Sequence, residues 1–307
     1  MKILIVARCK NGHYAPFITE QVAALEREGV DCRFFPVIQK GLIGYMQRLP
    51  ALRREIRVFA PDVVHAHFVF SGLLACLQRK VPVVTTYHGS DINDRRLLHL
   101  SKLVSLLSAW NIFVSPKNLE ISRCKKSFSV IPCGVDINDL QLTDRKMARK
   151  KLSLDEKKKY VLFAGSFDRE VKNPALARET VQRMGVEDIV LLEFKGYSRE
   201  EATLLMCAVD ALLLTSHNEG SPQVIKEALA CGCPIVSVDV GDVRDRVGEL
   251  VGCCVARQPD AGELSELLKQ ALSFTGKTNG RERILREGLD NTTVAKRIVS
   301  IYKMIIN

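Results

Sequence analysis

The 307-residue sequence predicts an α/β protein made of two doubly wound domains in tandem. Its length is about that of two domains of roughly 150 residues each. Short apolar runs alternate with amphipathic helical stretches, which is the pattern of a parallel sheet with helices on both faces. The alternation stops at a charged segment poor in strands, residues 138–160, and then starts again.

In the first half, each short apolar run is interpreted as a buried strand, and the periodic segments between runs are interpreted as helices. Helices are expected near 16–29 and 44–59. The expected strands are KILIVA (2–7), DCRFFPV (31–37), VVHAHF (63–68), VPVVTTY (81–87), NIFVS (111–115) and FSVIP (128–132).

In the second half, the same alternation predicts a second parallel sheet. Its expected strands are YVLFAGS (160–166), IVLLEF (189–194), ALLLTS (211–216), PIVSVDV (234–240) and ELVGCCVA (249–256). We therefore expect a first domain over 1–150, a second over 151–288 and a closing helix within 289–307. Because such sheets bind ligands at their carboxyl edges, a cleft between the domains is the expected site.

The excess of positive over negative charge is confined to the first half of the chain. Residues 1–150 hold 23 Lys and Arg against 12 Asp and Glu, whereas residues 151–307 hold 22 against 23. A one-sided basic domain indicates an anionic partner, such as a membrane surface, a phosphorylated acceptor or nucleic acid, or else serves solubility. Nucleic acid is disfavoured, because no recognition motif and no basic-aromatic interleaving occurs.

The ten cysteines show no CxxC pairing, and most lie in apolar runs, so we expect reduced, buried thiols in a cytosolic protein. The apolar run at the N-terminus is too short for a signal peptide, and no run approaches the roughly 18 apolar residues of a membrane span. ALSFTGKT (271–278) lacks the first glycine of a phosphate-binding loop, and no GxGxxG follows a strand. No Asp-x-Asp occurs either, so no metal is expected to bridge a nucleotide diphosphate.

The stretch HNEGSPQVIKEALACG (217–232) places two glutamates eight positions apart. It is interpreted as a loop followed by a helix with Ser221 at the N-cap, Pro222 at the first helical position and Gly232 at the stop. Its free amides suit phosphate or sugar oxygens. Glu219 could then accept hydroxyls beyond the phosphates and Glu227 the hydroxyls of a ribose, although both could also be ordinary surface acids.

This stretch resembles the E-x7-E signature of retaining GT-B glycosyltransferases, in particular glycosyltransferase family 4 (group 1). Further matches follow the family order: VVTTYHGSDI (83–92), VIPCGVD (130–136) and FAGSFDREVKNP (163–174). The resemblance implies two Rossmann-like domains, the first for the acceptor and the second for the nucleotide sugar, and a last helix that returns to the first domain.

The resemblance also implies roles for single residues. Glu219 would bind the donor sugar near the reaction centre and Glu227 its ribose, while Lys172 would bind the diphosphate and offset its charge without a metal. His88 would approach the donor sugar from the first domain. The sugar and phosphate pocket would be lined by Gly220, Ser221, Pro222, Gln223 and Val224. The acceptor or phosphate loops would comprise Asn11, Gly12, His13 and Asp91, whereas His65 and His67 are expected to be structural.

Two positions depart from the family pattern. Ser166 stands where many relatives carry an arginine, so Lys172 lacks its usual partner unless Arg169 replaces it. Gly12 is a single glycine where many relatives have two adjacent. These departures leave open a catalytically weak or inactive nucleotide-sugar-binding protein, and a GT-B phosphorylase or epimerase is the other alternative.

The implied reaction moves a hexose-type sugar, with UDP-sugar favoured, to a glycan or lipid-linked hydroxyl with retention of configuration and no metal or other cofactor. The expected pathway is cell-surface polysaccharide or lipopolysaccharide synthesis. The acceptor could be met at a membrane, because KGLIGYMQRLPALRREIRVFA (40–60) combines apolar residues with arginines. The same segment could equally be a helix packed on the sheet, and Pro50 predicts two shorter pieces.

Overall fold

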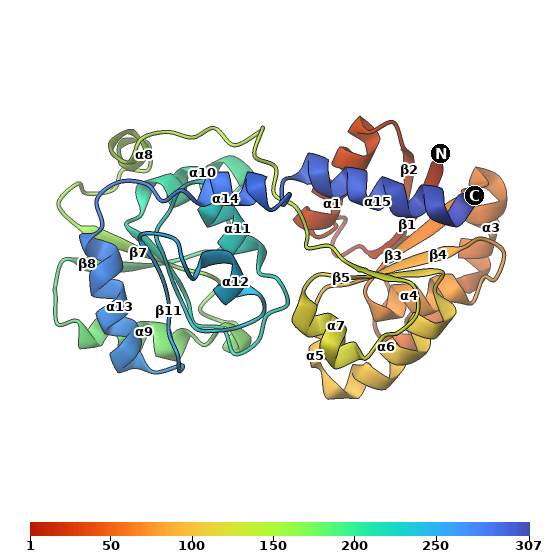
Figure 1. Cartoon of the computed structure of the whole chain (residues 1–307), viewed down its shortest axis with the longest axis horizontal. Helices are drawn as coiled ribbons and strands as arrows, with labels where there is room; N and C mark the ends of the chain where they lie inside the picture. The colour runs from red at the N-terminus through yellow and green to blue at the C-terminus, as the bar shows by residue number, and fades with distance from the viewer. The chain divides into compact units, whose positions relative to one another are not determined.

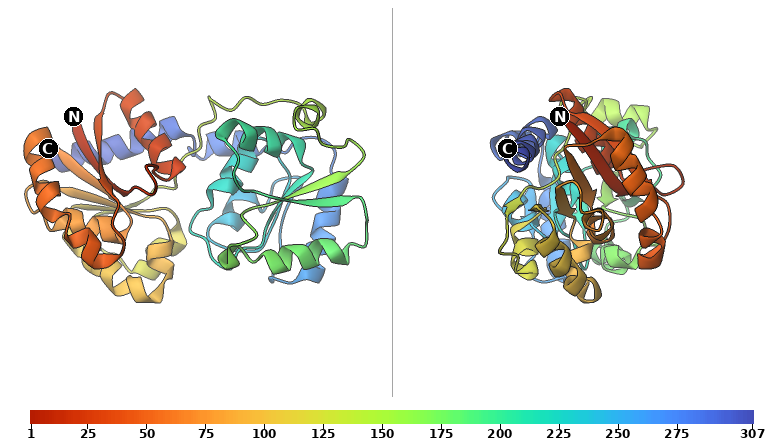
Figure 2. Two further views of the ribbon diagram at one scale, coloured as in Figure 1. Left: turned by 180° about the vertical axis from the view of Figure 1, so that it is seen from behind. Right: turned by 90° about the vertical axis from the view of Figure 1, so that its right-hand side faces the viewer.

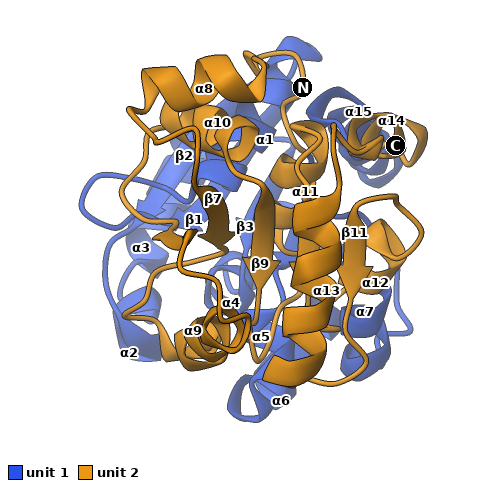
Figure 3. Ribbon diagram, turned by 90° about the vertical axis from the view of Figure 1, so that its left-hand side faces the viewer, with its two compact units in different colours: residues 1–134, 289–307 blue, residues 135–288 orange.

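The computed structural model describes all residues, 1–307, and divides them into two compact units (Figure 3). Unit 1 comprises residues 1–134 and 289–307, and unit 2 comprises residues 135–288. Each unit is a parallel sheet covered by helices on both faces, so the predicted fold class is confirmed. The division after Gly134 replaces the expected one at residue 150, because helix α8 (Arg145–Lys151) packs against α10 (Arg199–Ala208) within unit 2.

The sheet of unit 1 has the strand order β2-β1-β3-β4-β5-β6, with every neighbouring pair parallel. In this order β2 lies on one side of β1, and β3 to β6 follow on the other side. The switch point, where the strand order reverses, therefore lies between β1 and β3. The strands are β1 Lys2–Arg8, β2 Asp31–Val37, β3 Val63–His67, β4 Val83–Tyr87, β5 Trp110–Phe113 and β6 Phe128–Val130.

Two helix layers bury the faces of this sheet. On one face, α1 and α15 pack together, although α1 follows the first strand and α15 ends the chain (Figures 1 and 2). Their shared core includes Ile18, Leu25, Ile298 and Tyr302. The helices of unit 1 are α1 Pro16–Arg27, α2 Gly41–Met46, α3 Leu49–Phe59, α4 Val69–Cys76, α5 Ser90–Asn93, α6 Arg95–Leu107, α7 Pro116–Ser122 and α15 Asn291–Ile306.

Residues 40–60 form the two separate helices that Pro50 predicted, α2 and α3. Most of their apolar stripe belongs to the core, because Tyr45, Leu52 and Ile56 are buried against the sheet. Ile43 is the most exposed apolar side chain of the segment, at 76%. The structure thus supports a packed pair of helices rather than a continuous apolar face for a membrane. Nowhere in the chain is a helix both long and apolar enough to span a bilayer.

The sheet of unit 2 has the order β11-β10-β9-β7-β8, again entirely parallel. Its switch point lies between β7 and β9, the first and third strands of the unit. The strands are β7 Lys159–Phe163, β8 Ile189–Glu193, β9 Ala211–Leu214, β10 Ile235–Ser237 and β11 Cys253–Val255.

In unit 2, α9 and α13 cover one face of the sheet, and α8, α10, α11 and α14 lie on the other (Figure 1). Side-chain caps define several helix starts, such as the reciprocal box between Ser198 and Glu201 at α10. The remaining elements of this unit are η1 Glu170–Lys172, α9 Pro174–Arg183, α11 Gln223–Ala230, α12 Val243–Val247, α13 Ala261–Ser273 and α14 Gly280–Arg286.

Candidate functional site

The loop that follows β7 brings Lys172 to the switch point of unit 2. Gly165 permits this, because a Cβ on it would lie 2.8 Å from Cγ of Lys172. Asn173 then turns the chain with a φ of 53° and caps α9. The hydroxyl of Thr215, at the end of β9, donates to the carbonyl oxygens of Lys172 and Asn173 at 3.0 and 2.9 Å. The two loops of the switch point are therefore tied together.

An ion pair joins the same two loops. Nζ of Lys172 lies 2.7 Å from Oε1 of Glu219, and the two side chains are only 15% and 16% exposed. The backbone amide of His217 also donates to the carbonyl of Val171 at 3.0 Å. Shielded from water, this pair interacts more strongly than a surface pair does. It places a lysine and a carboxylate together at the edge where α/β sheets bind ligands.

The chain enters α11 differently from the sequence prediction. Pro222 occupies the N-cap and the helix begins at Gln223, with no side-chain cap. Ser221 is not the N-cap, because its hydroxyl donates to Oδ2 of Asp242 at 2.9 Å instead. Gly241 makes this approach possible, since a Cβ there would lie 2.5 Å from the carbonyl oxygen of Gly220. The helix N-terminus thus keeps amides that no side chain caps.

Glu227 is a partly buried member of α11 and not a fully solvated surface acid. Its side chain is 18% exposed, and Arg199 of α10 reaches its Oε1 at 3.1 Å. Burial raises the pKa of Glu227, and the charge of Arg199 opposes that rise. The predicted stripe of Val224, Ile225, Ala228 and Leu229 is buried as expected, and Gly232 ends the helix with a φ of 68°. The role of Arg199 was missed, because nothing near it in the sequence points to Glu227.

Ser166 lies in an acidic setting within the β7 loop. Its hydroxyl can donate to Oε1 of Glu193 at 2.8 Å or to Oδ1 of Asp168. Oε1 of Glu193 also accepts from the amide of Phe167 at 2.6 Å, and Lys195 pairs with Asp168 at 2.8 Å. Arg169 is exposed to solvent. The hydroxyl of Ser166 thus stabilises the loop by hydrogen bonding to two carboxylates.

In unit 1, Asp91 shapes the loop that carries His88. Oδ1 of Asp91 accepts from the amides of His88 and Gly89 at 3.1 and 3.2 Å, and Gly89 has a φ of 103° that favours glycine. Asp91 is almost fully buried, and this burial raises the pKa of its carboxyl to about 7. Its side chain therefore holds the loop that the sequence analysis assigned to the acceptor or phosphate.

His88 joins a row of three stacked histidine rings. Its Nε2 lies 3.0 Å from Nδ1 of His67, and its Nδ1 lies 3.5 Å from Sγ of Cys133. His67 stacks in turn on His65, which contacts Tyr302 of α15 at 2.5 Å and Thr86 at 2.8 Å. Burial lowers the pKa of His67 to about 3, so its ring is neutral. His65 braces the core as expected, whereas the contact of His67 with His88 was not predicted.

The loop after β1 borders a cavity of about 380 Å³. Asn11 and Gly12 both have positive φ, and Lys10 and His13 exchange backbone hydrogen bonds at 2.9 and 3.0 Å across the turn. Tyr14 stacks on Phe34 beneath it, with ring centroids 4.2 Å apart. The cavity is lined by Arg8, Lys10, His13, Tyr14, Ala15, Ile18 and Phe68. Arg8 and Lys10 were not predicted as site residues, although their charges flank the predicted loop.

Comparison with known families identifies the chain. The model of Glycosyltransferase Family 4 matches residues 7–139, and the model of Glycosyl transferases group 1 matches residues 147–273. The chain belongs to the group 1 glycosyltransferases. The two matched segments correspond to the unit that holds His88 and the unit that holds Lys172 and Glu219.

Two curated relatives of this glycosyltransferase are about a quarter identical to it within the aligned part. TuaC of Bacillus subtilis (strain 168), named as a candidate teichuronic acid biosynthesis glycosyltransferase, is 27% identical over an alignment of 220 residues, and this alignment covers 62% of this chain and 56% of that protein. A D-inositol 3-phosphate glycosyltransferase of Geodermatophilus obscurus is 24% identical over 268 residues, covering 69% and 59%. The chain thus spans less than two thirds of the length of these relatives.

Solved structures share the fold of this glycosyltransferase. Sucrose-phosphate synthase of Thermosynechococcus elongatus superposes with a TM-score of 0.81 at 16% identity, covering 99% of this chain and 98% of that one. HepE of Anabaena, solved in complex with UDP, has a TM-score of 0.77 at 17% identity and covers 99% and 100%. At these identities the likeness establishes the fold.

The buried carboxyl of Asp91 is expected to make the stability of the glycosyltransferase depend on pH. Between pH 4 and 7, roughly, the folded state holds a proton that the unfolded state has lost, so the free energy of unfolding falls by about 1.4 kcal/mol per pH unit as pH rises. Asp91→Asn should flatten this slope in urea unfolding measured from pH 4.5 to 7.5.

Asp94→Asn is the matched control for that measurement. Asp94 caps α6 three residues further on, and Asn is an equally good cap. The hydrogen bond with Arg96 lowers its pKa, so its titration lies below the window and the slope should stay as in the wild type. If the unfolding free energy of Asp91→Asn has the same slope against pH as that of the wild type, Asp91 is ionised in the folded protein over the whole pH range measured.

Proposed function

We propose that this chain transfers a hexose-type sugar from a UDP-sugar to a hydroxyl group of a glycan or lipid-linked acceptor in cell-surface polysaccharide synthesis. The observation that carries the proposal is the shielded Lys172–Glu219 pair at the switch point of unit 2. A lysine there can bind the diphosphate, and a carboxylate beside it can accept sugar hydroxyls. HepE, which shares the fold, was solved with UDP and with UDP-glucose, and this supports the choice of nucleotide.

In this proposal Glu227 accepts the two hydroxyls of the donor ribose. A carboxylate does so best when ionised, because it then offers only acceptors. Burial works against ionisation and Arg199 restores it, so the pair makes a partly buried carboxylate usable for binding. The uncapped amides at the start of α11 are then available to the phosphates or the sugar.

The chemistry proposed is transfer with retention of configuration and without a metal ion. Lys172 would offset the charge that develops on the departing diphosphate, and the protein would otherwise position the two substrates. His88 would contact the donor sugar from unit 1. The cationic residues Arg8 and Lys10 around the cavity of the β1 loop favour an acceptor that carries an anionic group.

Donor binding is tested by thermal shift with UDP-, GDP-, ADP- and CMP-sugars. A ligand at 100 times its Kd stabilises the folded state by about 2.7 kcal/mol, which raises the Tm by several degrees. We expect the UDP series to give this shift in the wild type and Glu227→Ala to lose it. Glu200→Ala is the control, because Glu200 is an exposed acid in the first turn of α10 and should leave the shift intact.

A nucleotide-sugar-binding protein without turnover is the second candidate. It is favoured by Ser166, whose hydroxyl contacts Glu193 and Asp168 at the position where the family resemblance implies an arginine. Release of free UDP that depends on an acceptor separates the two candidates. Acceptor-dependent release of UDP would also exclude a phosphorylase or an epimerase. A Tm shift with UDP-sugar but no release of UDP would support the binding protein. If no nucleotide sugar shifts the wild type, both candidates fail.

A further inference from the structure

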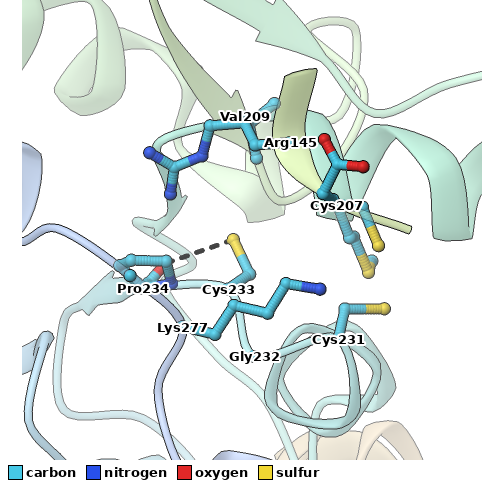
Figure 4. Close-up of a pocket in the computed structure, with 11 residues that line it drawn as sticks. Arg145, Cys207, Val209, Cys231, Gly232, Cys233, Pro234 and Lys277 are labelled. Carbon is cyan, nitrogen blue, oxygen red and sulfur yellow. Dashed lines mark hydrogen bonds between the residues drawn. The ribbon is translucent and has the colours of Figure 1, made fainter. Parts of the chain in front are cut away.

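A second cavity, of about 250 Å³, lies in unit 2 away from the proposed donor site (Figure 4). Val209 and Pro234 line it, and they lie just before two strands, Val209 two residues before β9 and Pro234 one residue before β10. The cavity is thus at the amino edge of the sheet, whereas Lys172 and Glu219 are at the carboxyl edge. Three cysteines reach it from two helix ends: Cys207, Cys231 and Cys233.

Charged side chains line the cavity near its thiols, namely two cations and the carboxylate of Asp144. Arg145 and Lys277 both line it, and the amino group of Lys277 points into the space beside the cysteines (Figure 4). Nζ of Lys277 donates to the carbonyl of Thr143 at 3.0 Å, which holds the side chain in place. No group of three or more His, Cys, Asp or Glu side chains is arranged to hold a metal ion here or elsewhere in the chain.

Cys207 and Cys231 differ in their acidity. The hydrogen bond with Cys231, the backbone of Thr143 and the charge of Lys277 lower the pKa of Cys207 to about 6. The neighbouring thiol and burial raise the pKa of Cys231, which caps the carboxyl end of α11 where a negative charge is unfavourable. Burial raises the pKa of Cys253 to about 12. The contact with Cys231 and the charge of Lys277 therefore favour the thiolate on Cys207, which is the more acidic of the two thiols.

We propose that Cys207 and Cys231 form a redox-active pair that a hydroperoxide converts to a disulfide. The thiolate of Cys207 attacks one peroxide oxygen and breaks the O–O bond, which gives a sulfenic acid and releases the alcohol or, from hydrogen peroxide, water. The thiol of Cys231 then attacks the sulfenic sulfur, the S–S bond forms, the S–O bond breaks, and the oxygen leaves as water with the thiol proton. The two thiols lose two electrons and the peroxide gains them.

The position of this pair connects it to the donor site. Cys207 lies at the end of α10 and Cys231 at the end of α11, and the same two helices carry Arg199 and Glu227. A disulfide would fix the carboxyl ends of both helices against each other and so change the freedom of the Arg199–Glu227 pair. This consequence rests on the proposed function, whereas the thiol chemistry does not.

The chemistry is tested on the full-length reduced protein with one equivalent of hydrogen peroxide, followed by alkylation and peptide mass spectrometry. We expect a crosslink between Cys207 and Cys231, reversed by dithiothreitol and absent from Cys207→Ser and Cys231→Ser. In Cys231→Ser the sulfenic acid should persist on Cys207 and be trapped by dimedone. Cys253→Ser is the control and should form the crosslink as the wild type does.

Alkylation rates keep the proposal testable if a variant folds poorly. In the wild type, iodoacetamide should label Cys207 before Cys253, because Lys277 beside Cys207 favours its thiolate, whereas burial raises the pKa of Cys253. Equal labelling of the two cysteines, or a disulfide that joins other cysteines, would overturn the proposal. The UDP-sugar thermal shift is then compared between oxidised and reduced protein. If the crosslink forms but UDP-sugars shift the Tm of neither the oxidised nor the reduced protein, the proposed function is contradicted and the redox pair is still supported.

Discussion

Lys172→Ala is expected to lower kcat/KM for sugar transfer by about 100- to 1,000-fold, the loss seen when one preorganised charge-stabilising donor is removed. In the proposed function Lys172 is the cation that meets the departing diphosphate, and its Nζ lies 2.7 Å from Oε1 of Glu219. Its removal also leaves the carboxylate of Glu219, 16% exposed, without its cation. The measurement is the rate of acceptor-dependent UDP release.

Lys195→Ala is the matched control for Lys172→Ala. Lys195 pairs with Asp168 of the same β7 loop at 2.8 Å, but both side chains are more than half exposed. An exposed pair of this kind contributes little, so the rate should stay within about threefold of the wild type. If kcat/KM falls by less than about tenfold in Lys172→Ala, or if it falls equally in both variants, Lys172 is not the diphosphate ligand.

The stability of unit 2 should depend strongly on Asp210. Asp210 is 3% exposed and accepts from Arg149 at 2.6 Å, from Arg145 at 3.2 Å and from the backbone amide of Tyr160 at 2.8 Å. Asp210→Ala leaves the buried guanidinium of Arg149 without its carboxylate. Breaking a buried pair in this way costs about 3–5 kcal/mol of unfolding free energy, measured by urea denaturation.

Glu266→Ala serves as the control for Asp210→Ala. Glu266 pairs with Lys269 at 2.7 Å on α13, but its side chain is 66% exposed. Its loss should change the unfolding free energy by less than about 0.5 kcal/mol. A similar small loss in Asp210→Ala would mean that water or a neighbouring group compensates Arg149, and the buried network would not be a main support of the unit.

The sequence by itself determined the class of fold and the identity of most elements. Burial on both faces forces parallel strands to be continuous apolar runs, and helices must show a 3.6-residue period, so both patterns are visible locally. The buried stripe of α11 and the glycine that ends it follow from the same local rules. The break at Pro50 was also predictable, because proline cannot donate a helical hydrogen bond.

Only the tertiary structure decided which of these residues meet. Lys172 and Glu219 are 47 positions apart and come together because β7 and β9 are neighbours in the sheet. Arg199 reaches Glu227, Ser221 turns to Asp242, and Asp91 is buried against its own loop, all through packing between elements that no local pattern encodes. The thiols of Cys207 and Cys231 follow the same rule. Cys207 lies in the last turn of α10 and Cys231 caps the carboxyl end of α11, and only the meeting of these two helix ends beside Lys277 places both thiols in one cavity.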